Sequence, residues 1–262
     1  MESKLSYFYN IGAINAKKII DKLLDLKLVD KQKVIDNIYT NNDLRLILLN
    51  KKIFGELPIA TQYDLVYRPI RIIPRHIIIL INRELYLYIK PIQYIIAGSF
   101  IRGKTTSSDI DLVIINDNNI NISDYLINTI NKKSKCIKFH KPFATGPHKI
   151  TTLIEVNLNK TNLYKEIPEF INKYKSFNYK INVKVDIFLT TSDNYIFTLL
   201  FATGSGIFNI RTRMIAKKKG YKLNQDGLWL KIPTGYKKIK VKSELDLFKL
   251  LDITYVSPEN RN

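Results

Sequence analysis

The sequence predicts an α+β protein in which N-terminal helices precede a central mixed β-sheet, and a small α+β subdomain follows. In residues 1–90, apolar side chains recur at the three- and four-residue spacing of a buried helix face. From about residue 92 the pattern changes to short apolar runs typical of buried strands, and after residue 193 the helical spacing returns. We therefore predict subdomains at residues 1–90, 91–192 and 193–262.

The N-terminal helices are predicted from their apolar stripes. In NAKKIIDKLLDLKLV the stripe consists of Ile19, Ile20, Leu23, Leu24 and Leu28. The segment NDLRLILLN predicts a further helix. In IIPRHIIILINRELYLYI a helix would begin at Pro74, because proline is tolerated in the first helical turn.

The strands of the central sheet are predicted from four apolar segments, IQYIIAGSF, IDLVIIN, KITTLIEVNL and INVKVDIFLT. A helix, DYLINTINKK, separates the second strand from the third. The polar stretch between Asn157 and Tyr179 is expected to be a surface excursion between two strands. Beyond the sheet we predict helices in YIFTLLFATG and FNIRTRMIAKKKG, then short strands around LWLKIPTGYKKIKV.

The charge of the chain indicates an anionic partner. Its 262 residues include 42 Lys and Arg against 23 Asp and Glu, a formal net charge of +19. Nucleic acid is the expected partner for such an excess, with an anionic membrane surface or the codon bias of an AT-rich genome as alternatives. No apolar run reaches the roughly 20 residues that cross a bilayer, and the N-terminal residues lack the order of a signal peptide. We expect an intracellular protein, in the nucleus, the cytoplasm or a viral replication compartment.

Three aspartates are the candidate catalytic residues and metal ligands. Asp109 and Asp111 are two residues apart, so a strand would place both carboxylates on one face. Their repulsion would be relieved by a hard divalent cation. Asp186 lies in another apolar strand, with Lys184 on its face. If the two strands are neighbours, the three carboxylates can hold two Mg²⁺ ions, as nucleotidyl transfer requires. Strand-end caps or calcium ligands are the alternatives for the Asp pair alone.

The loop before the Asp pair is suited to phosphate. Gly98 lets the backbone approach an anion, Ser99 offers a hydroxyl, and Arg102 and Lys104 add positive charge. Backbone N–H groups in such a turn bind anions. A strand, a Gly-Ser turn, a basic loop and an Asp-x-Asp strand together therefore predict a triphosphate site.

These motifs resemble the nucleotidyltransferase superfamily, whose signature is Gly-Ser followed by a short loop and Asp-x-Asp. A second segment, LLFATGSGIFNIRTR at 199–213, is similar to the family X DNA polymerases, the DNA polymerase beta-like branch of that superfamily. The segments IIPR, GPHKITTLIEV and SELDLFKLLDITYVSPENR resemble the same family. The likeness implies a helix-hairpin-helix DNA-binding subdomain, a palm that carries the nucleotidyltransferase site, and a C-terminal subdomain that binds the nascent base pair.

The resemblance also implies a role for individual residues. Asp109, Asp111 and Asp186 would bind two Mg²⁺ ions, for which Mn²⁺ can substitute. The triphosphate would be held by Arg75, Ser99, Arg102 and the backbone of Ser108. The sugar and base of the nucleotide would meet Phe201, Ala202, Gly204 and Asn209. The DNA would meet Lys149, Lys184, which replaces an arginine of the family, and Arg213.

The segment YNIGAINAKKIID resembles a helix-hairpin-helix, with an ordinary helix start as the alternative. The resemblance implies DNA contacts at Ile11, Gly12 and Ala16. Asn10 stands in place of the first hairpin glycine, and asparagine is the next residue most tolerant of positive φ. A monovalent cation is expected on the carbonyl groups of Ser6, Phe8 and Ile11.

The family likeness implies a gap-filling repair polymerase that adds dNMP to a primer 3′-hydroxyl and releases pyrophosphate. Its expected partners are primer–template or gapped DNA, dNTP and a DNA ligase, and we expect a monomer. Only about ten residues precede the hairpin, so a minimal form without the N-terminal lyase domain is expected. Phe201-Ala202 and Gly206 depart from the family pattern. They keep open a template-independent terminal transferase or a DNA-end-binding module.

Overall fold

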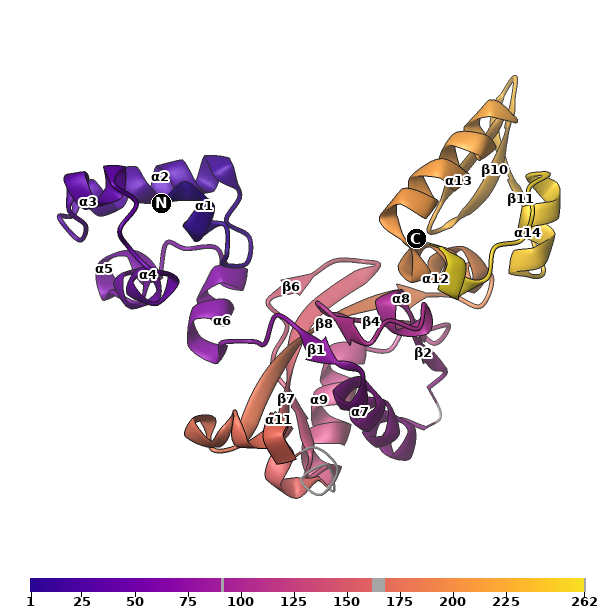
Figure 1. The fold of residues 1–262 in the computed structure, drawn as a ribbon. Helices are drawn as coiled ribbons and strands as arrows, with labels where there is room; N and C mark the ends of the chain where they lie inside the picture. Colours follow the sequence, from indigo (N-terminus) through magenta and orange to yellow (C-terminus); the bar gives the residue numbers. More distant parts are fainter. Residues whose placement is uncertain (91, 162–167, 262) are drawn as a thin grey trace. The chain divides into compact units, whose positions relative to one another are not determined.

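The computed structural model describes residues 1–90, 92–161 and 168–261, and the chain forms two compact units, residues 1–69 and 70–262 (Figure 1). The expected excursion between Asn157 and Tyr179 is described only in part, because residues 162–167 lie outside these ranges. In the described ranges, no helix combines the length and the apolar character that crossing a bilayer requires.

The first unit is helical, as predicted. It consists of α1 (Glu2–Leu5), α2 (Ala13–Asp25), α3 (Lys31–Ile35), α4 (Asn41–Leu48), α5 (Lys51–Phe54) and α6 (Ile59–Tyr67). The apolar stripe of α2 supplies the buried Ile19, Ile20 and Leu23, which pack in one core with Leu44 of α4. Between α1 and α2, Asn10 has a φ of 65°, so it takes the left-handed conformation expected for the hairpin position.

The boundary between the units lies about twenty residues earlier than the sequence suggests. Helix α7 (Arg75–Tyr88) was grouped with the N-terminal helices, but its apolar face belongs to the core of the second unit. Ile77, Ile81 and Leu85 are almost fully buried there among side chains of the sheet. The apolar stripe predicts a buried helix face, but the spacing of apolar residues does not determine which core buries it.

The central sheet has the order β2-β4-β8-β7-β5, formed by β2 (Tyr94–Ile96), β4 (Ile110–Ile115), β8 (Lys180–Thr190), β7 (Lys149–Asn157) and β5 (Ile137–Phe139). Strands β4 and β8 run parallel, whereas the other neighbours along this order are antiparallel. A short strand, β6 (Ala144–Thr145), also pairs with β7. The mixed sheet expected from the four apolar segments is thus present.

One face of the sheet is apolar and the other carries polar side chains. Leu112, Val185 and Ile187 belong to the core that α7 and α9 (Ile122–Lys133) share with the sheet. Because successive side chains of a strand point to opposite faces, Asp111 and Asp186 lie on the other face. The alternation therefore leaves the acidic side chains outside the main core.

The C-terminal part of the second unit forms a small core of its own. It contains α12 (Tyr195–Thr203), α13 (Gly206–Lys218), the antiparallel sheet of β9 (Tyr221–Asn224), β10 (Gly227–Ile232) and β11 (Gly235–Ile239), and α14 (Glu244–Leu250). Leu223, Leu228, Leu247 and Phe248 are buried in it. Helix α12 also contacts β4 and β8, and so joins this part to the polar face of the central sheet.

Candidate active site

The two predicted acidic strands are neighbours. In the parallel pairing of β4 with β8, Asp111 lies directly opposite Asp186. Asp109 immediately precedes β4, so its side chain leaves the chain on the same side as that of Asp111. The adjacency on which the predicted metal site depends is therefore present in the sheet.

Asp111 is the most strongly perturbed of the three carboxyl groups. Its burial and the negative charges of Asp109 and Asp186 raise its pKa to about 7. The backbone of Gly98 lies so close that a Cβ there would be 2.0 Å from Oδ2 of Asp111, and Gly98 has a φ of 61°. Only glycine fits both the space and the backbone conformation.

Asp186 is held by side chains from two strands. Thr151 of β7 donates a hydrogen bond to its Oδ1 at 2.8 Å, and the ammonium groups of Lys149 and Lys184 lie 3.0 Å from its Oδ2. Burial alone would raise the pKa of Asp186, but the charge of Lys184 and the hydrogen bonds from Thr151 and Lys184 hold it below its ordinary value. Thr151 was not predicted, although its position two residues after Lys149 places it on the same strand face.

Lys184 joins the two outer carboxylates. Its Nζ lies 3.0 Å from Oδ2 of Asp109 and 3.0 Å from Oδ2 of Asp186, and the charges of these aspartates raise its pKa against the effect of burial. Within the described ranges, no three carboxylate, imidazole or thiol groups are gathered closely enough to hold a metal ion as they stand. Positive charge from lysine occupies the space between the acids instead, so this face of the sheet favours cations.

The predicted phosphate loop begins with a turn of helix. Residues Gly98–Ile101 form α8, where the sequence suggested an open turn. The Ser99 hydroxyl donates to Oγ of Ser107 at 2.6 Å, and the Ser108 hydroxyl donates to Oδ1 of Asp109 at 3.1 Å. The loop therefore brings hydroxyl groups and backbone N–H groups next to the aspartates.

Both predicted phosphate-binding arginines support this loop. Arg75 donates from Nη1 to the carbonyl oxygen of Phe100 at 2.6 Å and lies over the Phe100 ring, 4.1 Å from its centroid. Arg102 donates to the carbonyl oxygen of Thr203 at the end of α12. Sequence spacing did not reveal these backbone contacts. They hold the loop against its neighbours, and the predicted triphosphate contacts of both arginines remain predictions.

The segment predicted to read the base pair lies at the junction of α12 and α13. The Asn209 side chain donates to the carbonyl oxygen of Phe201 at 2.8 Å, and the Arg213 guanidinium lies over the Phe201 ring at 5.2 Å. Ala202 is buried with Val113 and Phe188 of the central sheet, so its side chain faces the protein. Gly204 has a φ of 67°, which explains a glycine at this turn.

In the first unit, the three residues of the predicted hairpin differ in their exposure. Gly12 is the N-cap of α2, and a Cβ there would meet no atom within 4 Å. Ile11 and Ala16 are buried in the helical core. Ile11 and Ala16 therefore serve the helical core, whereas Gly12 leaves open space at the helix start, and the DNA contacts of all three remain predictions.

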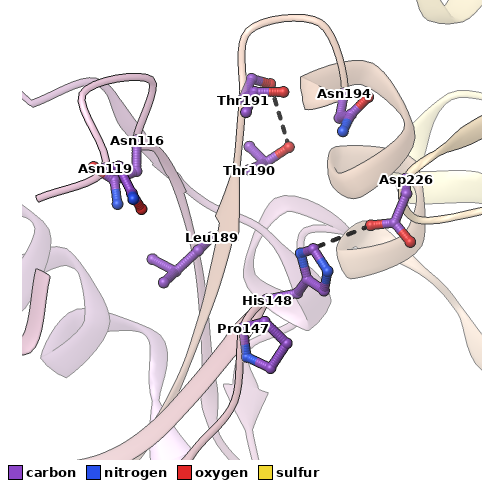
Figure 2. Close-up of a pocket in the computed structure, with 9 residues that line it drawn as sticks. All are labelled: Asn116, Asn119, Pro147, His148, Leu189, Thr190, Thr191, Asn194 and Asp226. Carbon is purple, nitrogen blue, oxygen red and sulfur yellow. Dashed lines mark hydrogen bonds and ion pairs between the residues drawn. The ribbon is translucent and has the colours of Figure 1, made fainter. Parts of the chain in front are cut away.

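A cavity of about 180 Å³ lies next to Lys149, where His148 precedes β7 (Figure 2). Figure 2 shows the imidazole turned toward Asp226, with Nδ1 3.9 Å from Oδ1. Asn194 at the start of α12 also lines this cavity. The cavity therefore lies at the end of β8, between the residues that precede β7 and the turn that joins β9 to β10.

Comparisons with known proteins agree with this architecture. Residues 198–262 match the family model described as the DNA polymerase beta thumb. The chain is 22% identical over 179 residues to DNA polymerase lambda of Arabidopsis thaliana, covering 65% of this chain and 32% of the relative. It is 34% identical over 85 residues to the Repair DNA polymerase X of an African swine fever virus isolate, covering 31% of this chain and 46% of the relative.

A solved structure resembles nearly the whole chain. It is the Leishmania infantum polymerase beta in a ternary P/T complex, with a TM-score of 0.68 and 19% identity, covering 98% of this chain and 96% of that one. The chain spans less than half the length of the curated relatives given above, 32% and 46%.

The sheet order, the helices around it and the matched structure define a chain with the polymerase beta fold. The thumb model matched by residues 198–262 and the named relatives make the chain similar to the family X DNA polymerases. These matches agree with the family resemblance that the sequence motifs indicate.

Proposed function

We propose that the chain is a template-directed, gap-filling DNA polymerase that adds dNMP to a primer 3′-hydroxyl and releases pyrophosphate. The observation that carries this proposal is the register of the parallel strands, which sets Asp111 opposite Asp186 with Asp109 beside them. The names of the relatives support it, because they are DNA polymerases and one is a repair polymerase.

The carboxylate chemistry of the three aspartates suits divalent metal ions, which would take the place that the Lys184 ammonium group occupies between Asp109 and Asp186. Carboxylate oxygens are the ligands that Mg²⁺ and Mn²⁺ prefer, and the raised pKa of Asp111 reflects negative charge that a cation would neutralise. Asp109, Asp111 and Asp186 would hold two Mg²⁺ ions. Bound there, the ions would activate the attacking hydroxyl and neutralise charge on the phosphates.

The remaining residues of the site would position the substrates. Ser99 and the backbone N–H groups of the loop from Gly98 to Ser108 would bind the triphosphate, with Arg102 and Arg75 supporting the loop and adding positive charge. Lys149 and Lys184 would exchange their carboxylate contacts for DNA phosphates. This exchange explains how cationic side chains can lie among the aspartates and still serve DNA binding.

The C-terminal turn and the helical unit would hold the DNA. Phe201, Gly204, Asn209 and Arg213 would line the nascent base pair. The open helix start at Gly12, held by the buried Ile11 and Ala16, would contact the duplex, with a monovalent cation at the hairpin. We further propose that the chain acts as a monomer and that a DNA ligase seals the nick left after gap filling.

Extension of gapped DNA tests the proposal. Purified protein is incubated with a one-nucleotide-gapped duplex, dNTPs and Mg²⁺, beside the Asp186→Asn variant. Templated incorporation by the wild type and its loss in the variant are expected. Equal products from the two proteins would overturn the polymerase function.

The departure at Phe201-Ala202 makes a terminal transferase the second candidate. The same assay with a single-stranded primer separates the two functions. Extension of the single strand as fast as the gapped duplex, with no preference for the complementary dNTP, would favour the transferase.

A further inference from the structure

The sheet β9-β10-β11 has one buried face and one open face. Leu223, Leu228 and Ile239 pack into the C-terminal core on the buried face. Figure 1 shows α13 running along this sheet, and α13 contacts β9. The strand partners Lys222, Trp229 and Lys238 alternate with those leucines, so they point to the opposite face.

The open face combines aromatic rings with lysines. Trp229 of the central strand lies between Lys222 and Lys238, whose Nζ atoms are 5.9 Å and 5.8 Å from the indole centroid. Lys222 also lies 5.6 Å from the ring of Tyr236, and Tyr236 is paired across the strands with Lys231. Tyr236 is 55% exposed. The three strands, all within the described ranges, contain no acidic residue.

The backbone beside Trp229 leaves space for its ring. Gly227 has a φ of 154°, and a Cβ there would lie 3.2 Å from the indole and 2.9 Å from the end of Lys238. A side chain at residue 227 would therefore crowd the position that the indole occupies. Lys238 also donates to Oδ1 of Asn194 at 2.5 Å, and Asn194 lines the cavity of Figure 2.

We propose that this open face, formed by Lys222, Trp229, Lys231, Tyr236 and Lys238, is a binding site for single-stranded nucleic acid. Unpaired bases would stack on the two rings, which a duplex cannot do because its bases are already stacked. The lysines would turn from the rings to the phosphates. Aromatic rings between cations are the arrangement that binds single strands without sequence preference. This function is separate from catalysis at the aspartates.

The site can be tested without dNTP or incorporation, because Trp229 is the chain's single tryptophan. The full chain is titrated with an oligothymidylate of about 12 nucleotides, within the usual site size of such surfaces. Saturable quenching of Trp229 fluorescence is expected, with weaker quenching by a blunt duplex. Trp229 fluorescence of the Asp186→Asn variant should be quenched as strongly as that of the wild type. Failure of the polymerase proposal and failure of the single-strand site are therefore distinguishable.

Lysine variants complete the test. The Lys222→Ala, Lys231→Ala and Lys238→Ala triple variant should bind a labelled oligothymidylate roughly tenfold more weakly. The slope of log affinity against log salt should fall by about two, since each contact to a single strand contributes about 0.7. A control that removes Lys132, Lys133 and Lys135, which are exposed near the end of α9, loses equal charge and should bind normally. Circular dichroism checks the folding of both variants.

Three results would overturn the proposed single-strand binding site. They are equal quenching by duplex and single strand, equal loss of affinity in the control variant, and absence of quenching by the oligothymidylate. In a parallel arm, anionic phosphatidylserine vesicles are added. A blue shift of Trp229 fluorescence with vesicles but no response to the oligothymidylate would assign the face to a membrane surface instead.

Discussion

Gly98 has no room for a side chain because the carboxylate of Asp111 occupies the position where a Cβ would project, with Oδ2 only 2.0 Å away. The positive φ of Gly98 adds a second requirement for glycine. Gly98, the first residue of the predicted phosphate loop, and Asp111 on β4 are therefore fitted to one another.

Replacing Gly98 by alanine is expected to displace the Asp111 carboxylate and to lower gap filling by roughly a hundredfold, as misplacements of about 1 Å in an active site do. Single-turnover incorporation on a gapped duplex measures the effect. Gly55→Ala is the matched control, because a Cβ at Gly55 meets no atom within 4 Å. Near-normal incorporation by Gly98→Ala would contradict the close fit between Gly98 and the Asp111 carboxylate.

Lys184→Met is expected to make the stability of the protein depend more strongly on Mg²⁺. Without the ammonium group, the repulsion among the aspartates is less compensated, so Tm in a chelator should fall below that of the wild type. Added Mg²⁺ should raise the Tm of the variant by more than it raises the Tm of the wild type. Lys180→Met, on the same strand but paired with Glu155, should show no such recovery.

Glu244→Gln is expected to lower the free energy of unfolding by about 3 kcal/mol, because it leaves a buried guanidinium without its counter-charge. Arg261 has a fully buried side chain, pairs with both Glu244 carboxylate oxygens at 2.9 and 2.5 Å, and lies over the rings of Phe208 and Phe248. Chemical denaturation measures the change. Lys219→Met removes an exposed pair with Asp252 and should cost less than about 1 kcal/mol. Equal losses of unfolding free energy in the two variants would contradict the larger contribution expected of the buried pair between Glu244 and Arg261.

His140 is expected to make the protein less stable at mildly acidic pH. Burial lowers its pKa below the ordinary value of 6.5, against the hydrogen bond between Nε2 and Asn182. Above pH 6.5 the imidazole is neutral in both states and contributes no pH dependence. As the pH falls through 6.5, the unfolded chain takes up the proton first, so stability is lost until the folded pKa is reached.

The His140→Gln variant should lose this part of the pH dependence. Urea denaturation of both proteins between about pH 5 and 8 measures it. An unchanged dependence in the variant would show that other groups cause it.

The sequence predicted the order of elements and the central pair of acids, because both depend on local patterns. Short apolar runs identify β4 and β8, and the spacing of Asp109 and Asp111 follows from strand geometry. Glycine and asparagine at special backbone positions, such as Gly98 and Asn10, were also recognisable from their residue types.

Long-range contacts were not predictable in this way. Arg75 and Arg102 have the side chains of phosphate ligands, but their partners are backbone carbonyl groups that folding brings near. The burial of Arg261 depends on aromatic residues from separate helices. The contact between Thr151 and Asp186 joins strands 35 residues apart. Such pairs depend on tertiary packing, which residue spacing does not encode.

The position of β8 also has a consequence for how the protein is made. Strand β8 is central in the sheet, between β4 and β7, yet it leaves the ribosome after both. Until it emerges, β4 and β7 each present an unpaired edge beside apolar side chains, a state prone to aggregation. Insertion of β8 closes both edges and brings Asp186 to Asp111 in the same event. A nascent chain that has not yet reached Lys180 therefore carries Asp109 and Asp111 without Asp186, and the third carboxylate of the proposed site joins the other two only when the sheet is complete.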